Sequence, residues 1–354
     1  MTDRFIVDGV CHPYNFSPQN QRGRFGKLFT DVMHSYYPLV NPPEIQFSRA
    51  QWEREWGTEE FIDTMLLESD TDLCTVHTLP IYDAYVDGLT ATDKGVELKA
   101  NYPDRVLLYV GLDMFAEPEQ LLIEAQAAID AGADGLKFYP SRYMEGRTET
   151  WPVERMFPAL QLAQDAGIRN IGWHKVLPIG PVSTEGMGVD DVSVAANTFP
   201  DLNFQVIHAG FMFVDETTFL IANHPNVYVT MEASCLFAIL NPPQLQSILG
   251  SFMGFGGPHK VLYASAAVNP HPQPVIEALE SFEMPAGSPL QLTDEIRDMF
   301  MGGNLARLHG IDVDTRRAEL VDDRFSRYKV EHGRRAPWTA VHGDAAVHGG
   351  AVPA

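Results

Sequence analysis

Histidines, a lysine and a glutamate stand at or near the ends of short apolar stretches along this chain. His12 follows FIVDGVC, His174 ends IRNIGWH and His208 ends NFQVIH, while Lys137 lies in DGLKFYP and Glu232 in VYVTMEAS. Neutral imidazole is a good ligand for zinc, iron or manganese, and it titrates near neutral pH. Histidines gathered around one carboxylate can therefore hold a metal ion that activates water and polarises a carbonyl group.

The stretches that would position these residues alternate with amphipathic segments. Eight apolar runs are predicted as strands, each followed by a predicted helix: residues 5–12, 72–79, 106–113, 134–140, 168–175, 203–210, 227–234 and 260–267. This order predicts an α/β protein with a TIM (β/α)8 barrel, in which the chemical groups gather at the carboxyl ends of the strands. A doubly wound sheet is disfavoured because no GxGxxG follows an early strand.

The length of 354 residues fits one such barrel with additions. The barrel is predicted over residues 1–312. It includes an aromatic-rich insertion at about residues 13–57 that would lie over the mouth as a lid. Such a lid suggests an aromatic or cyclic substrate, and Arg22, Arg24 and Lys27 within it could bind a carboxylate. Residues 313–354 are predicted to be a tail that is flexible or contacts a second subunit.

The charge balance narrows the range of partners. Lys and Arg number 25 against 47 Asp and Glu, a net charge of -22, which argues against nucleic acid and anionic membranes as partners. The three cysteines are far apart, no apolar run approaches the ~20 residues of a membrane span, and the N-terminus has no secretion-signal pattern. We expect a cytoplasmic homo-oligomer, such as a homodimer, that acts on a small molecule.

These motifs in this order resemble the amidohydrolase superfamily, in the branch of the aminocarboxymuconate-semialdehyde and resorcylate decarboxylases. The resemblance runs from about residue 4 to about residue 312. It rests on Asp8 and His12 in a D-x-x-x-H opening and on GADGLKFYP, WHK, VIHAG, HPNVYVTME and GGNLARLHG. It implies a metal held by a pair of residues on strand one, a histidine on strand five and an aspartate on strand eight, with a strand-six histidine as acid or base.

Two positions depart from that pattern. Val10 stands where the first member of the strand-one pair would be, and Ala266 where the strand-eight aspartate would be. The resemblance therefore implies a rearranged site, in which a divalent metal (Zn, Fe or Mn) would be held by His12, His174 and Glu232. A metal-free site, as in the metal-independent lactonases of the superfamily, is the alternative.

Lys137 and His208 are predicted to be catalytic. Lys137 stands where other amidohydrolases carry a carboxylated lysine, and His208 would move a proton. The leading prediction is hydrolysis of a C–N, C–O or C–C bond next to a carbonyl in a small aromatic or cyclic molecule. The alternatives are non-oxidative decarboxylation of an aromatic acid, metal-independent lactone hydrolysis, and an inactive barrel that binds a ligand. Substrate contacts are predicted from Tyr14, Asn15, His77, Tyr139, Asn269 and His271.

Overall fold

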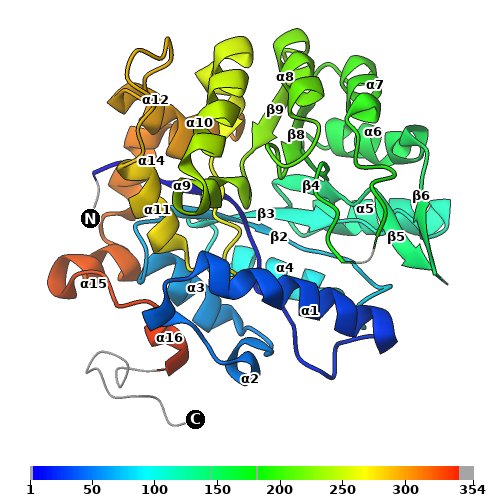
Figure 1. Cartoon of the computed structure of the whole chain (residues 1–354). Helices are drawn as coiled ribbons and strands as arrows, with labels where there is room; N and C mark the ends of the chain where they lie inside the picture. The colour runs from blue at the N-terminus through cyan, green and yellow to red at the C-terminus, as the bar shows by residue number, and fades with distance from the viewer. Residues whose placement is uncertain (1–2, 145, 181, 343–354) are drawn as a thin grey trace.

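The central element is a sheet of eight parallel strands, drawn in Figure 1. The computed structural model describes residues 3–144, 146–180 and 182–342 of the chain. The strands follow the order of the sequence: β1 (Val7–Cys11), β2 (Leu73–His77), β3 (Val106–Gly111), β4 (Gly135–Phe138), β7 (Asn170–His174), β8 (Asn203–Ile207), β9 (Val227–Thr230) and β10 (Val261–Leu262). Each of the eight lies within a predicted strand.

The sheet closes into a barrel between β1 and the segment that follows β10. Gly9 N donates to Tyr263 O at 3.0 Å, and His12 N donates to Ala267 O at 2.6 Å. These bonds join the first strand to the last, so the barrel has no open edge at this seam. The predicted TIM barrel is confirmed.

The Asp8 carboxylate strengthens the same seam. Its Oδ1 accepts from Ser265 N at 3.0 Å and its Oδ2 from Ser265 Oγ at 2.5 Å, and Val10 N donates to Oδ1 at 3.3 Å. Burial raises the pKa of Asp8 to about 7, while the hydrogen bonds from Ser265 oppose that rise. The acid of the D-x-x-x-H motif therefore has a structural position that ties strand one to strand eight.

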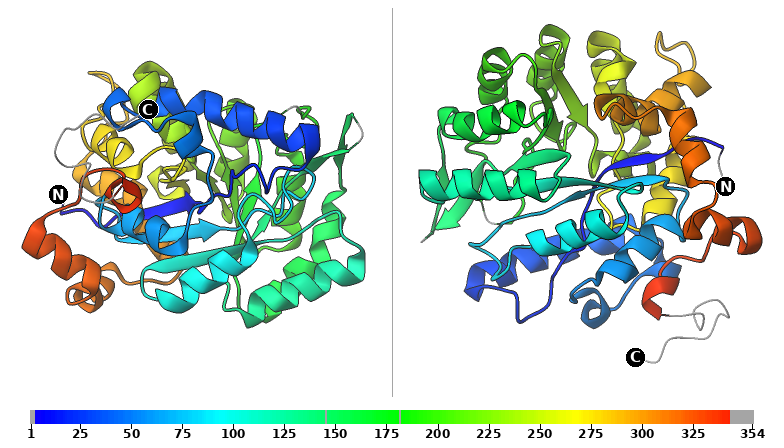
Figure 2. Two further views of the ribbon diagram at one scale, coloured as in Figure 1. Left: turned by 90° about the horizontal axis from the view of Figure 1, so that it is seen from below. Right: turned by 180° about the vertical axis from the view of Figure 1, so that it is seen from behind.

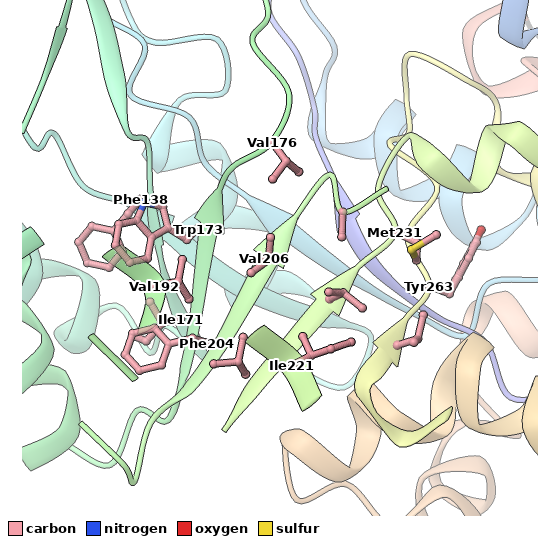
Figure 3. Close-up of a cluster of buried hydrophobic side chains, with 14 of the residues drawn as sticks. Phe138, Ile171, Trp173, Val176, Val192, Phe204, Val206, Ile221, Met231 and Tyr263 are labelled. Atoms are coloured by element: carbon pink, nitrogen blue, oxygen red, sulfur yellow. The ribbon is translucent and has the colours of Figure 1, made fainter. Parts of the chain in front are cut away.

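Helices cover the outside of the barrel, as the strand–helix alternation predicts. They are α3 (Thr58–Leu66), α4 (Thr92–Asn101), α5 (Pro118–Asp130), α6 (Phe157–Asp165), α7 (Asp190–Thr198), α8 (Val214–Asn223), α10 (Pro242–Ser251) and α11 (Pro272–Glu280). Figure 3 shows buried Trp173 and Phe204 side chains of β7 and β8 among apolar residues such as Val192 and Ile221 from the covering helices. The main hydrophobic core lies in this layer between sheet and helices.

The inside of the barrel is filled at mid-height by two aromatic rings. The His77 and Tyr109 rings stack with centroids 4.5 Å apart. A Cβ placed on Gly135 would lie 2.8 Å from the Tyr109 ring, and one on Gly172 would lie 3.3 Å from both rings. Glycine at these two strand positions therefore makes the space that the rings occupy.

Additional elements extend the barrel at the mouth and after residue 290. The insertion after β1 contains α1 (Gly23–Val40) and α2 (Arg49–Trp52), β5 (Ser141–Met144) pairs with β6 (Arg147–Thr150), and α9 (Phe237–Leu240) follows β9. The final helices are α12 (Asp294–Asp298), α13 (Asn304–Leu308), α14 (Val313–Leu320), α15 (Arg324–His332) and α16 (Thr339–His342). The predicted tail is therefore helical and packed over 313–342 (Figure 2), and its residues 343–354 lie outside the described part.

The buried Glu68 carboxylate holds the end of this segment. Its Oε2 accepts from Trp338 N at 2.6 Å and its Oε1 from Ala340 N at 2.5 Å. His271 Nε2 donates to Oε2 at 3.2 Å, since Nδ1 of the same ring accepts from Gln273 N. Trp338 also packs on the insertion, with its ring centroid 4.7 Å from that of Phe47. One acid thus joins α3, the start of α11 and the C-terminal segment.

Within the described part of the chain, no helix is long and apolar enough to cross a membrane. The predictions of a cytoplasmic location, of a homo-oligomer and of no nucleic-acid partner stay predictions.

Replacement of Glu68 tests the role of this anchor. We expect Glu68→Gln to lower the free energy of unfolding by about 2–4 kcal/mol, because two backbone N–H groups and an imidazole lose a charged acceptor in a dry site. Denaturant unfolding followed by circular dichroism measures the change. The exposed Glu44→Gln serves as control and should leave stability unchanged. Equal stabilities for the Glu68 variant and the wild type would contradict this account.

Candidate active site

A cavity of about 290 Å³ opens at the carboxyl ends of the barrel strands. Its lining includes all five residues from which the sequence predicted the chemistry: His12, Lys137, His174, His208 and Glu232. They come from five different strands or strand ends and are all buried. The barrel therefore brings together side chains that are up to 220 residues apart in sequence, since His12 and Glu232 both line the cavity.

The walls of the cavity are mainly apolar. Helix α1 of the insertion contributes Phe29, Met33 and Leu39, and α9 contributes Phe237 and Leu240. The insertion is predicted from sequence as an aromatic-rich lid, without a helix. A four-residue spacing, Phe25, Phe29, Met33 and Tyr37, marks the buried face of α1 and could have revealed this helix.

Three of the six predicted substrate contacts line the cavity: Tyr14, Tyr139 and Asn269. The other three lie elsewhere. His77 is below the site and its Nε2 donates to Gly9 O at 3.0 Å, and His271 is bound to Glu68. Asn15 forms a turn in which its Oδ1 accepts from Ser17 N at 3.1 Å. The prediction that these three contact substrate therefore has no support from their positions.

His12 is held in one orientation by the backbone of β2. Its Nδ1 donates to His77 O at 2.8 Å, because a carbonyl can only accept. In the neutral ring Nε2 is then an acceptor, and it lies 3.5 Å from Glu232 Oε1. When the ring is neutral, two hydrogen-bond acceptors, His12 Nε2 and Glu232 Oε1, therefore face one another at the cavity floor without a proton between them.

His174 and His208 form a second oriented pair. His174 Nε2 donates to Leu177 O at 2.7 Å, so Nδ1 of the neutral ring is an acceptor. It accepts from His208 Nε2 at 3.0 Å, and that nitrogen also lies 3.4 Å from Glu232 Oε2. Burial lowers the pKa of both histidines well below 6.5, and the Lys137 ammonium lowers them further. Both rings are therefore neutral at pH 7.

Lys137 differs from the other charged groups at the floor. Its side chain is 1% exposed, and it makes no hydrogen bond or ion pair with any residue in the described part of the chain. Burial lowers the pKa of the amine to about 8, while the nearby Glu232 carboxylate opposes the fall. The Tyr139 ring, whose centroid is 6.0 Å from Nζ, stacks on His174 at 4.1 Å.

The backbone turns sharply where several strands end at the cavity. His208, Ala233 and Ala266 have φ of +67°, +61° and +67°, and Val176 has φ of +57°. Residues other than glycine rarely adopt this conformation, and it costs of order 1 kcal/mol or more for each. These four strained positions follow β7, β8, β9 and β10, so strain accumulates at the rim that carries the site. Two further residues with positive φ, Phe213 (+53°) and Trp338 (+64°), do not line the cavity.

The side chains do not fit a bound metal as they stand. Val10 is buried against Ile207 and Ala264, and Ala266 offers no donor atom. Both ring nitrogens of His174 are engaged in hydrogen bonds. Among the described residues, no three His, Cys, Asp or Glu side chains form a group that could hold a metal ion. The ligand set His12, His174 and Glu232 therefore stays a prediction that this arrangement does not favour.

The cations of the insertion also lie away from the cavity. Arg22 lines a separate surface pocket, and Lys27 pairs with Asp31 at 3.3 Å. Of the described residues that line the cavity, Lys137 is the only lysine or arginine, and Glu232 is the only carboxylate. Among the described lining residues, one basic side chain therefore stands against one acidic side chain, and their formal charges cancel.

Comparisons with known proteins agree with this architecture. The family model described as amidohydrolase matches residues 84–311. A comparison with curated protein sequences gives no match.

Solved structures share the fold at low sequence identity. An uncharacterised TIM-barrel protein from Bordetella bronchiseptica has a TM-score of 0.64 and 15% identity, covering 86% of this chain and 98% of that one. A probable 2-pyrone-4,6-dicarboxylic acid hydrolase from Acinetobacter baumannii, with citric acid bound, has a TM-score of 0.53 and 11% identity, covering 86% and 99%. A 5-carboxyvanillate decarboxylase from Novosphingobium aromaticivorans, complexed with manganese and 4-hydroxy-3-methoxy-5-nitrobenzoic acid, has a TM-score of 0.56 and 13% identity, covering 87% and 97%.

The buried amine predicts an unusual dependence of stability on pH. The pKa of Lys137 falls from 10.5 to about 8 on folding, so between these values the unfolded chain binds the extra proton and stability rises with pH. We expect Lys137→Met to be more stable than the wild type by about 3 kcal/mol at pH 7, with the advantage shrinking from pH 8 to 10.5. Urea unfolding of both proteins across this range measures it, and a difference that is constant with pH would refute the burial of a free amine. The exposed Lys27→Met is the matched control.

Proposed function

This chain belongs to the amidohydrolase family, and we propose that it hydrolyses the ester or amide bond of a small, neutral cyclic molecule without a bound metal. The observation that carries the proposal is that Lys137, which has no hydrogen bond or ion pair among the described residues, and the buried Glu232 line the same apolar cavity. Such a pair supplies a cation for the carbonyl oxygen and a base for water. No step of the reaction then needs a group that the chain does not provide.

The attacking water would sit between His12 and Glu232. When the His12 ring is neutral, its Nε2 and Glu232 Oε1 are both acceptors, 3.5 Å apart, and one water molecule on the cavity side can donate to each. Its lone pairs then face the cavity. As the water oxygen bonds to the carbonyl carbon, Glu232 takes the proton and afterwards passes it to the leaving oxygen or nitrogen.

Lys137 would bind the carbonyl oxygen of the substrate. In its protonated form the amine donates to that oxygen and stabilises the negative charge that develops on it during attack. The dry surroundings strengthen this interaction, because water competes little at a buried site. His208 would assist the proton transfer, as its Nε2 lies 3.4 Å from Glu232 Oε2 and is held by His174.

The charge of the cavity supports a neutral substrate. One lysine faces one glutamate, and the walls are apolar. A dicarboxylate would bring two negative charges to a floor with no net positive charge, which costs desolvation without compensation. The apolar wall fits the hydrocarbon part of an aryl or alkyl lactone.

Decarboxylation of an aromatic acid is the second candidate. It is supported by the fold shared with the 5-carboxyvanillate decarboxylase. Lys137 would then pair with the carboxylate of the substrate. The balanced charge of the cavity and the donor set, which does not favour a metal, weigh against this reading.

Assays with paired substrates test the proposal. We expect dihydrocoumarin, a neutral aryl lactone, to be hydrolysed, and Glu232→Gln to lower kcat by about 100-fold or more because the base is lost. The exposed Glu283→Gln and treatment with a chelator should leave the rate unchanged. Release of carbon dioxide from a hydroxybenzoate, with no lactone turnover, would show decarboxylation and overturn the proposed hydrolysis. A lactonase rate that vanishes with the chelator would overturn the metal-free mechanism.

The pH profile gives an independent check on Lys137. Its protonated form binds the carbonyl oxygen, so we expect kcat/KM to fall as pH rises through about 8, the pKa of the amine. Lys137→Arg should be slower but should lose this fall, because a guanidinium stays charged. Stopped assays from pH 6 to pH 10 measure the profile. A wild-type rate that keeps rising above pH 9 would exclude the ammonium as the oxyanion ligand.

A further inference from the structure

The described part of the chain contains three buried lysines, and two of them have several hydrogen-bond acceptors each. Lys175, 0% exposed, donates to Gly186 O at 2.7 Å and to Asp191 Oδ2 at 2.5 Å. Lys260, 5% exposed, donates to the carbonyl oxygens of three residues of the β8–β9 region, among them Val227 O at 3.1 Å. These two amines stabilise the fold, because Lys175 donates to two fixed acceptors and Lys260 to three.

Lys137 is the exception among the three. It has no hydrogen bond or ion pair within the described residues, and it lines the cavity. A buried amine without acceptors is costly in its charged form, so the folded protein favours the free base more than water does. A neutral amine at the floor of an apolar cavity is a nucleophile toward carbonyl carbon.

The surroundings of Lys137 supply the other groups that such chemistry needs. Glu232 lines the same floor and can carry a proton, with His12 and His208 in contact with its two oxygens. The apolar walls from α1 and α9 limit access of bulk water, which would otherwise hydrolyse a C=N bond.

We propose that Lys137 forms a Schiff base with neutral aldehydes and ketones that enter the cavity. The Nζ lone pair adds to the carbonyl carbon, Glu232 carries the two amine protons in turn to the oxygen, and that oxygen leaves as water, so that a C=N bond remains. Protonation of the C=N nitrogen by water gives the iminium. The same carboxylate can then remove a proton from the carbon next to the iminium carbon, which gives an enamine, and return it. The net activity is exchange of the α-hydrogens of a cyclic ketone with those of solvent. The water lost when the C=N bond forms is taken up again when that bond is hydrolysed. This inference does not depend on ester hydrolysis.

Reductive trapping tests it. The purified full-length protein is incubated with cyclohexanone and sodium borohydride, and its intact mass is measured. We expect one adduct per chain, with the mass of the ketone minus one water plus two hydrogens, and peptide mapping should place it on Lys137. Lys137→Met should take no adduct, whereas Lys27→Met, which removes an exposed lysine, should label like the wild type. No adduct, or adducts spread over exposed lysines, would overturn the proposal.

A second measurement separates the roles of the two floor residues. In deuterated water the wild type should exchange the α-hydrogens of cyclohexanone. Glu232→Gln should slow this exchange by about 100-fold while trapping on Lys137 persists. Exchange that survives in Lys137→Met would also overturn the proposal.

The two activities are distinguishable by their pH dependence. Trapping needs the free amine and should rise from pH 7 to pH 9, whereas hydrolysis needs the ammonium and should fall. A chain that traps ketones but leaves lactones intact would refute only the hydrolase, and the reverse result would refute only the Schiff base.

Discussion

The seam between the first and last strands is the interaction on which the rest of this structure depends. Asp8 receives two hydrogen bonds from Ser265, and the backbone bonds of Gly9 and His12 join the same two segments. Without that closure, His12 would not lie opposite Glu232, because the two come from strands at different places in the sheet order. Asp8, which joins the first and last strands, stands four residues before His12, which lines the cavity. The D-x-x-x-H motif therefore serves both the barrel and the site.

Barrel closure also explains why the site is electrostatically unusual. The parallel strands carry the five polar groups to one small, dry space, where each charge has few partners. His174 and His208 stay neutral, since burial lowers the pKa of each. Lys137 and Glu232 then share a space in which no other lysine, arginine or carboxylate among the described lining residues screens them. The chemical character of the cavity follows from this small number of charges.

Much of the fold could be predicted from sequence, because a strand covered on both faces must be a short apolar run and a surface helix must alternate apolar and polar faces. The polar residues at strand ends predicted His12, Lys137, His174, His208 and Glu232, which line one cavity, while their roles stay predictions. The helix α1 was not predicted, since it begins without a capping side chain and its apolar residues lie among aromatic residues that also suit a loop. The helices after residue 312 were missed because α14 and α15 are mostly polar and bury only Leu320 and Phe325.

The sequence around a single residue does not tell which way its side chain points in the fold. A histidine at a strand end is equally compatible with facing the cavity, as His174 does, and with facing the barrel interior, as His77 does. His271 follows the last strand in the same way, yet it turns to Glu68 because helix α11 starts there and uses its ring as a cap. Only the arrangement of neighbouring segments decides between these outcomes.

The Glu68 anchor has a consequence for the order in which the chain can fold during its synthesis. Glu68 is made long before two of its hydrogen-bond donors, the backbone N–H groups of Trp338 and Ala340, which follow 270 and 272 residues later. Asp8 likewise waits 257 residues for Ser265. A nascent chain therefore holds two acids whose partners have not yet been made, and the barrel cannot close before its last strand exists.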